Sequence, residues 1–505
     1  MSVVQVLQGP SARPAAGTLE RYGLPGFFAT SLVAAGALVV GWIAPLSDLA
    51  SNPLLMAVRG SAVATSVGKL AVLVGAAWLL RTWVSLAPMV RGRDVAGARA
   101  LGWLALLWSL PLLVTPVLFS RDVFSYVAAS RLQPAGLDPY QVGTGALDTY
   151  VGDGADPMWA ESPAPYGPLW MLLSFVGYHL THAEAEAALL AFRLLAVAGV
   201  ALLVLYLPRL ASSAGADPGM AVWLAVLNPV VLFHLVSAAH NDALMIGLLV
   251  AGLALALEGR LLLGTALVAA AGAVKAPALV VLPFVALLWA GDDVSWSRRL
   301  RSWVQVGAVC LTVLAGLSLG SGLGPGWVGN LVGPAKVETW LSPVTALGRT
   351  LGYVAEPLGV ASGDTVLAVV RWGGTIATAA VIAWLLATSS RRSMLRGAGL
   401  ALLAVVALGP VVQPWYLLWP LALLAASRLR GAELRWTVGL SLGMSAYTVA
   451  NTAATTSSLG ALPEGVAALL AGAIVAGILL VPPSTRQMML GRRLPARRAV
   501  LAEVP

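Results

Sequence analysis

Long apolar stretches follow one another along most of this chain, and no other feature restricts its fold as strongly. A helix of about 20 apolar residues crosses a hydrocarbon core of about 30 Å. Several stretches have fewer than about 17 residues, so these need to be broken, tilted or buried among neighbours. The sequence predicts an all-α polytopic membrane protein with a bundle of about 12–14 transmembrane helices. The expected spans are 26–46, 61–84, 100–118, 184–208, 219–237, 241–257, 261–275, 276–290, 303–320, 364–388, 396–411, 415–427, 436–453 and 463–481.

Composition argues against a soluble domain. Of 505 residues, 59% are hydrophobic and only 10% are charged, against about 25% charged in an average soluble domain. A soluble protein cannot bury that much apolar surface, because its own exterior needs polar cover. Cys310, the one cysteine, lies inside a predicted span, so neither disulfides nor a cysteine metal site is expected. The absence of a Walker loop or dinucleotide fingerprint leaves ATP- or NAD-driven chemistry unsupported.

The net charge of +9 would suit a nucleic-acid partner, but its placement does not. Arginines and lysines lie singly or in short clusters between spans, as the positive-inside rule describes for cytoplasmic loops. We therefore expect no nucleic acid, a multi-pass cell-membrane protein and both termini in the cytoplasm. The predicted parts are a tail at 1–25, a transmembrane domain at 26–482 and a basic tail at 483–505. The first twenty residues hold no apolar core, which disfavours a cleavable signal peptide.

Two long loops are expected on the outer face, at about 119–183 and 321–363. Long ordered loops in compact proteins are usually functional. Residues 121–132 predict an amphipathic surface helix with Val123, Phe124 and Val127 toward lipid, and 166–182 a re-entrant or interfacial helix. No internal repeat supports an inverted-repeat transporter.

Asp122 directly follows the third predicted span, so it lies at the membrane–water boundary. A carboxylate there can act as general base on a hydroxyl, beside a lipid-borne substrate. Equally, it can be an aspartate that favours the helix dipole, paired with Arg121. Asp138, in LDPY, is a weaker second candidate, since solvated loop charge explains most acidic residues here.

Further polar residues interrupt apolar sequence at three places. His240, Asn241 and Asp242 begin a predicted helix, where a functional role is favoured over simple capping. His234 and His240 are six residues apart and do not share a helix face, which disfavours a zinc pair. Lys275 lies at a break before Pro277, where a lipid phosphate would compensate its charge better than snorkelling. Arg193, inside a span, is either a second phosphate ligand or a structural partner of Glu186.

The segment GPVVQPWYLLWP at 409–420 breaks another pair of spans. Trp415 and Tyr416 fit an interfacial aromatic belt or stacking on a sugar ring or polyprenyl chain, with Gln413 bonding hydroxyls. For Trp419 the belt is the preferred interpretation.

Taken together, these motifs resemble a known family. They are RDVFSYVAASRLQPAGLDPY, PAPYGPLW at 163–170, NPVVLFHLVSAAHNDALMIGL at 228–248, GAVKAPA at 272–278 and QPWYLLW at 413–419. Their order resembles the actinobacterial polyprenol-phosphate-mannose-dependent α-1,6-mannosyltransferases, membrane glycosyltransferases of the GT-C superfamily. The resemblance covers about residues 100–425, and the terminal segments match only in hydropathy.

The resemblance implies inverting transfer of mannose from polyprenyl-phosphate mannose to a lipid-anchored α-1,6-mannan acceptor, as in lipomannan and lipoarabinomannan assembly. It implies Asp122 as the base and Lys275, with Arg193, as donor-phosphate ligands. A cationic side chain can stabilise a leaving phosphate, so no cofactor or metal is expected. Two alternatives stay open: an α-1,2-mannosyl- or arabinosyltransferase, and a non-enzymatic lipid-sugar flippase or transporter. The expected substrate-binding residues are Arg121, Tyr126, Asp138, Tyr166, His240, Asn241, Asp242, Gln413, Trp415 and Tyr416.

Overall fold

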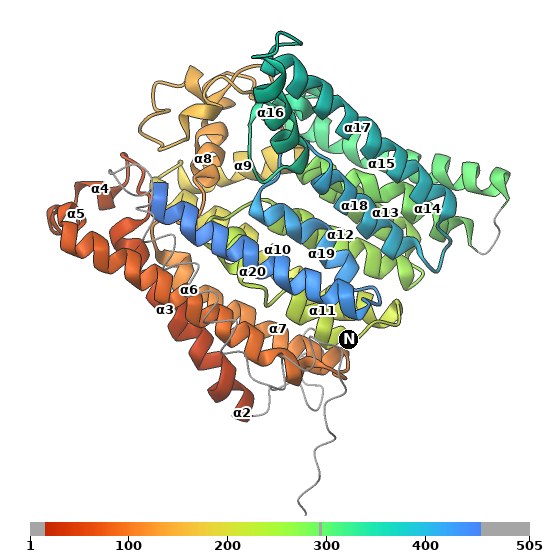
Figure 1. Ribbon diagram of the computed structural model, residues 1–505, viewed down its shortest axis with the longest axis horizontal. Helices are drawn as coiled ribbons and strands as arrows, with labels where there is room; N and C mark the ends of the chain where they lie inside the picture. The colour runs from red at the N-terminus through yellow and green to blue at the C-terminus, as the bar shows by residue number, and fades with distance from the viewer. Residues whose placement is uncertain (1–15, 292–294, 456–505) are drawn as a thin grey trace, which may run out of the picture.

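The computed structural model describes residues 16–291 and 295–455. The predicted span at 463–481, the tail at 483–505 and most of the tail at 1–25 lie outside the described residues. Within the described ranges the chain is helical, and its one extended pairing is an isolated bridge between Trp42 and Val117. The prediction of an all-α membrane protein is confirmed (Figure 1).

The first part of the described chain runs from residue 16 to residue 225. Its elements are α2 (Ala16–Thr18), η1 (Leu19–Gly23), α3 (Leu24–Val40), α4 (Asp48–Ser51), α5 (Pro53–Gly60), α6 (Ala62–Val90), α7 (Val95–Ser109), η2 (Leu110–Val114), α8 (Asp122–Leu132), η3 (Thr144–Ala146), η4 (Pro157–Trp159), α9 (Pro168–Thr181), α10 (Ala185–Ser213) and α11 (Pro218–Ala225).

The second half contains several short helices separated by breaks. Its elements are η5 (Val231–Ser237), α12 (Asp242–Leu257), α13 (Leu261–Val274), η6 (Ala276–Val281), α14 (Leu282–Ala290), α15 (Trp296–Ser321), η7 (Gly326–Lys336), α16 (Pro343–Ala355), α17 (Gly363–Thr388), α18 (Met394–Ala407), η8 (Pro414–Leu417), α19 (Leu418–Ala425) and α20 (Gly431–Thr455).

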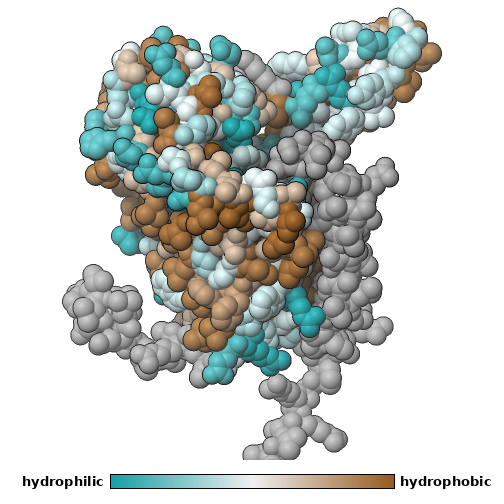
Figure 2. All heavy atoms as spheres, turned by 90° about the vertical axis from the view of Figure 1, so that its left-hand side faces the viewer, coloured by the Kyte–Doolittle hydropathy of each residue, from teal (hydrophilic) through white to brown (hydrophobic). Residues whose placement is uncertain are grey.

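Six described helices are long and apolar enough to cross a membrane, and the pair η5 and α12, bent by 109°, adds a seventh. The other predicted spans in this part are mostly shorter apolar helices, so the count by length is smaller than the predicted 12–14. The predicted span 276–290, for example, is a 3₁₀ turn followed by the nine-residue α14. Figure 2 shows hydrophobic side chains across the middle of one face, with hydrophilic ones above and below, as expected for a bundle in lipid.

Helix α12 lies in the core of the bundle, between α10 and α13. Two glycines allow α10 and α12 to approach closely: a Cβ on Gly199 would lie 2.3 Å from the Ala243 carbonyl, and one on Gly247 would lie 2.5 Å from the Gly199 carbonyl oxygen. Small residues commonly permit such close crossings in membrane bundles. The crossing fixes the first turn of α12, where Asp242 lies.

The two predicted outer loops meet at one end of the bundle, near α8, α9 and α16 in Figure 1. Gln133 donates to the Ser321 carbonyl (3.0 Å), and Asn330 donates to the carbonyls of Tyr140 (3.0 Å) and Ala164 (3.2 Å). These bonds join segments far apart in the sequence into one structure.

Basic loops gather at the other end. The backbone N–H of Gly92 bonds to Asp217 (2.8 Å), and Arg428 donates to the Gly215 carbonyl (2.8 Å). The 29-residue α10 connects the two ends, and at 1.5 Å per residue it is long enough to span a bilayer core. The bundle therefore has one basic end and one loop-covered end.

Candidate active site

Asp122 is positioned by a strained turn at the start of α8. Phe119 has φ of 74°, unusual for a non-glycine residue, and its ring packs 4.7 Å from that of Phe233. The Asp122 backbone N–H then bonds to the Ser120 hydroxyl (3.3 Å). Backbone strain of this kind is often found at functional sites. The turn leaves the Asp122 side chain 25% exposed.

His240 faces Asp122 from the broken span. A π-helix, η5, ends at Ser237, and Ala239 adopts φ of 53° before α12 begins; π segments also recur at functional sites. The His240 Nδ1 lies 3.5 Å from the Asp122 Oδ2, and the imidazole stacks on Trp415 with ring centroids 3.8 Å apart. His240 is fully buried, so its ring is held between the carboxylate and the indole.

Behind this pair lies a buried ion pair. Asp242 is fully buried and accepts from Lys275 Nζ (2.7 Å) and from Trp419 Nε1 (2.6 Å). The Lys275 ammonium lies 5.3 Å from the Tyr416 ring centroid and 5.6 Å from that of Trp419, within cation–π range. Breaks between successive helices, before α12, η6 and η8, bring these residues together.

Asp122 and Lys275 line one cavity of about 410 Å³. Along α8 the lining residues are Asp122, Ser125, Ala129 and Leu132, which lie on one face of the helix. The remaining lining residues come from the two predicted outer loops, from the start of η6, and from the stretch that runs from the end of α18 to the start of α19. They are Val142, Thr144, Trp159, Ser162, Pro163, Ala164, Pro165, Tyr166, Lys275, Ala276, Pro277, Leu331, Val405, Gly409, Pro410, Val411, Tyr416 and Trp419.

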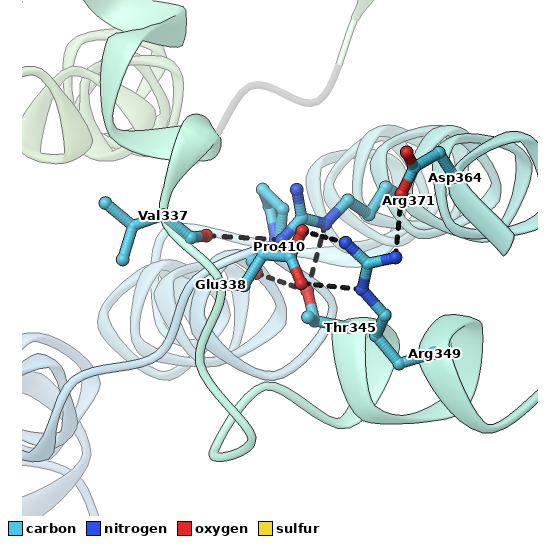
Figure 3. Close-up of polar contacts among 7 residues, drawn as sticks. All are labelled: Val337, Glu338, Thr345, Arg349, Asp364, Arg371 and Pro410. Atoms are coloured by element: carbon cyan, nitrogen blue, oxygen red, sulfur yellow. Dashed lines mark hydrogen bonds and ion pairs between the residues drawn. The ribbon is translucent and has the colours of Figure 1, made fainter. Parts of the chain in front are cut away.

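One wall of the cavity, residues 409–411, is held by the second outer loop (Figure 3). Thr345 donates to the Pro410 carbonyl and accepts from Arg371 of α17 (3.0 Å). Arg349, in the middle of α16, pairs with Glu338 and with Asp364 (2.8 Å), which ties α16 to the segment before it and to the start of α17. These polar contacts fix the loop that carries the wall.

Burial raises the pKa of Asp122 from its ordinary value of 3.8 to about 6. The Lys275 charge opposes this rise, whereas the nearby Asp242 carboxylate adds to it. A carboxylate with such a pKa is a stronger base than an ordinary aspartate, yet it is still ionised at neutral pH.

Two family models match this chain. Residues 23–291 match the N-terminal domain of alpha-(1->6)-mannopyranosyltransferases, and residues 344–481 match the MptB C-terminal domain. The chain belongs to the alpha-(1->6)-mannopyranosyltransferase family. Family membership makes it a membrane glycosyltransferase.

Three related proteins are similar in sequence to this chain over most of their own length. A probable alpha-(1->6)-mannopyranosyltransferase of Mycolicibacterium smegmatis is 35% identical over 73% of this chain and 72% of its own. Alpha-(1->6)-mannopyranosyltransferase A of Mycobacterium tuberculosis is 32% identical over 84% and 82%. Alpha-(1->6)-mannopyranosyltransferase B of Corynebacterium glutamicum is 28% identical over 88% and 77%. No solved structure gives a significant match.

In this mannosyltransferase-family chain, several predicted site residues come together. Asp122, Tyr166, Lys275 and Tyr416 line the cavity, and His240, Asp242 and Trp415 contact them from behind. Asn241 precedes α12, but its buried side chain makes no capping bond, so capping does not explain it.

The other predicted site residues do not line this cavity. Arg121 donates to the Gly154 carbonyl (2.8 Å), and Asp138 bonds to the backbone N–H of Tyr140 (2.8 Å) and to the side chain of Gln141 (3.0 Å). Tyr126 packs against Tyr166 and Trp170, and Gln413 is half-buried at the start of η8. Buried Arg193 donates to the carbonyls of Leu113, Thr115 and Ser237.

Two sequence-based interpretations are wrong. Helix α8 begins one residue later than the predicted 121–132, and Val123, Phe124 and Val127 are at most 5% exposed, because protein rather than lipid covers them. Trp419 is 4% exposed and donates to Asp242, so it is not a belt residue. No local pattern in the sequence points to Thr144 or Trp159, which line the cavity from the three-residue 3₁₀ turns η3 and η4.

Proposed function

We propose that this glycosyltransferase moves mannose, with inversion, from polyprenyl-phosphate mannose to the 6-hydroxyl of an α-1,6-mannan chain of a lipoglycan such as lipomannan or lipoarabinomannan. The printed names of the relatives support mannosyl transfer and the α-(1→6) linkage. The observation that carries the proposal is a single cavity lined by an ionised carboxylate, Asp122, and an ammonium, Lys275.

The two groups suit different parts of the reaction: Asp122 the acceptor hydroxyl, and Lys275 the leaving phosphate. Asp122 takes the proton from the acceptor 6-hydroxyl as that oxygen forms its bond to the anomeric carbon. The bond from the anomeric carbon to the phosphate oxygen breaks, and the lipid phosphate leaves with the electron pair. Attack opposite the leaving group converts a β-linked donor into an α-linked product.

The Lys275 ammonium is placed to bind the leaving phosphate. An ammonium has three N–H donors, and Asp242 accepts one of them. The side chain is 15% exposed, so its other donors can reach a phosphate in the cavity. Beside it, Ala276, Pro277 and Val405 give the cavity an apolar border suited to a polyprenyl chain.

His240 positions the base in this mechanism. Its Nδ1 is 3.5 Å from the Asp122 Oδ2 and stacking on Trp415 fixes the ring plane. A neutral imidazole with its proton on Nδ1 can donate a hydrogen bond to this carboxylate oxygen. The second carboxylate oxygen then takes the proton of the acceptor hydroxyl.

The proposal places the cavity on the outer face and both termini in the cytoplasm. It is supported by the position of the cavity at the end of the bundle opposite the basic loops, because positive loops favour the cytoplasmic side.

The direct test is transfer by the purified full-length chain from polyprenyl-phosphate mannose to a synthetic α-1,6-mannobioside, followed by linkage analysis. Asp122→Asn should lower kcat by about 100- to 10,000-fold, since the base is lost. Asp148→Asn, an exposed aspartate of the same loop, is the matched control and should keep full activity.

Each alternative gives a different outcome. Full activity of Asp122→Asn would refute the mechanism. An α-1,2 linkage or arabinose in the product would identify another lipid-linked sugar transferase. Movement of labelled lipid across vesicles without sugar transfer, unaffected by Asp122→Asn, would identify a transporter.

A further inference from the structure

The cavity has two chemically different halves. The half next to η6 and α18 has Lys275 and the aliphatic groups of Ala276, Pro277 and Val405. The half made by the first predicted outer loop has hydroxyls and an indole, from Thr144, Trp159 and Ser162, set among the apolar groups of Val142 and residues 163–165. Asp122 lines the same cavity as the residues of these two halves.

Two hydroxyl groups of residues that line the cavity have no hydrogen-bond partner among the residues that the structure describes. Thr144 is only 6% exposed, yet its Oγ1 makes no hydrogen bond, and the same holds for the buried Oγ of Ser125. Buried hydroxyls are nearly always bonded. Ser125 lies one turn after Asp122 on the cavity face of α8. The hydroxyls of Thr144 and Ser125 can therefore bond a polar ligand in the cavity that the proposed base also lines.

The loop half is also firmly built. The Gly145 N–H bonds to the Ala160 carbonyl (2.9 Å), and a Cβ on Gly143 would lie 2.0 Å from that oxygen. Asp156 caps η4 through the Met158 N–H (3.1 Å), which fixes Trp159 at the end of this turn. Thr144 and Trp159 are therefore held together by backbone contacts and do not depend on a ligand for their position.

We infer that Thr144, Trp159, Ser162 and Ser125 form the acceptor subsite. Trp159 stacks on a sugar ring of the mannan, while the three hydroxyls bond sugar hydroxyls. An apolar ring with a few placed polar groups is the usual composition of a site that fixes ligand orientation. The subsite directs the 6-hydroxyl of the terminal mannose to Asp122. This inference rests on the proposed function.

Steady-state kinetics separate the acceptor from the donor. Trp159→Ala should raise the KM for an α-1,6-mannobioside about tenfold and leave the KM for polyprenyl-phosphate mannose within twofold. Trp159→Phe, which keeps an aromatic face, should recover most of the loss. Thr144→Ala should raise the acceptor KM about threefold, and Thr144→Ser, which keeps the hydroxyl, should restore it.

Trp340→Ala is the matched control, because Trp340 is a 66% exposed tryptophan of the second outer loop and does not line the cavity. It should leave both KM values unchanged. If Trp159→Ala shows no transfer, direct binding decides: the variant should bind the donor lipid and fail to bind the mannobioside.

Several results would overturn the inference. A rise confined to the donor KM would place the donor sugar in this half, and unchanged acceptor binding in both Trp159→Ala and Thr144→Ala would remove the subsite. These outcomes require that the unmodified protein transfers mannose. Absence of transfer by the unmodified protein would count instead against the proposed function.

Discussion

Asp122→Asn should make the protein inactive and at the same time more stable. Burial raises the pKa of Asp122 from 3.8 to about 6, a rise of roughly two pKa units, and each unit corresponds to about 1.36 kcal/mol. The ionised carboxylate therefore costs the folded protein up to about 3 kcal/mol at neutral pH. Asparagine has nearly the same shape and no charge, so the variant avoids that cost.

The gain should depend on pH in a defined direction. The folded protein binds the Asp122 proton more tightly than the unfolded chain does, so its stability falls as pH rises from about 4 to about 6. The stability difference between Asp122→Asn and the unmodified protein should therefore be small near pH 4, grow up to about pH 6 and stay constant above it.

Thermal unfolding in nanodiscs at pH 4.5 and pH 7.5, with transfer activity measured in parallel, tests this reasoning. Asp242→Asn is the control of opposite sign, because Asp242 is a fully buried carboxylate paired with Lys275, and its loss should destabilise the protein. A lower unfolding midpoint for Asp122→Asn at pH 7.5 would show that Asp122 is mainly a structural helix-start residue and would contradict the argument.

Three other outcomes are expected. The acid limb of kcat/KM should have its midpoint near pH 6, since Asp122 must be ionised; a midpoint near pH 4 would contradict burial of the base. Lys275→Met should lower the free energy of unfolding by about 3–5 kcal/mol. This loss should exceed that of Asp242→Asn, because Lys275→Met leaves the charge of the fully buried Asp242 unpaired, whereas Asp242→Asn leaves unpaired only the charge of Lys275, which lines the cavity. The double variant, assayed by thermal unfolding, should recover part of the loss. Gly199→Ala should cost about 1–3 kcal/mol and reduce transfer, since its Cβ would press on the first turn of α12; Gly177→Ala, with open space around it, should change neither.

The sequence was sufficient to predict the class of fold and two charged residues of the site, Asp122 and Lys275. Hydropathy predicts helices in lipid because each helix satisfies its own backbone hydrogen bonds, independently of distant residues. The same local logic located Asp122 at the end of an apolar stretch and Lys275 at a break before a proline. Both positions are visible in a few neighbouring residues, and both residues line the cavity.

The partners of these residues came only from the tertiary structure. Lys275 pairs with Asp242, and Trp419, expected at the membrane interface, donates to the same carboxylate. Each pair joins different broken helices, so no local pattern relates them. Arg193 likewise bonds carbonyls from two other segments.

The loop half of the cavity shows the same limit. Thr144 and Trp159 lie in 3₁₀ turns of only three residues, which are too short to show a periodic pattern. The contact between Gly145 and Ala160 that joins these turns follows from the path of the whole loop. The sequence by itself determined which segments enter lipid and where charge interrupts them, because transfer from water to lipid is decided residue by residue. Which charge meets which partner depends on the packing of helices distant in sequence, and only the folded bundle decides that.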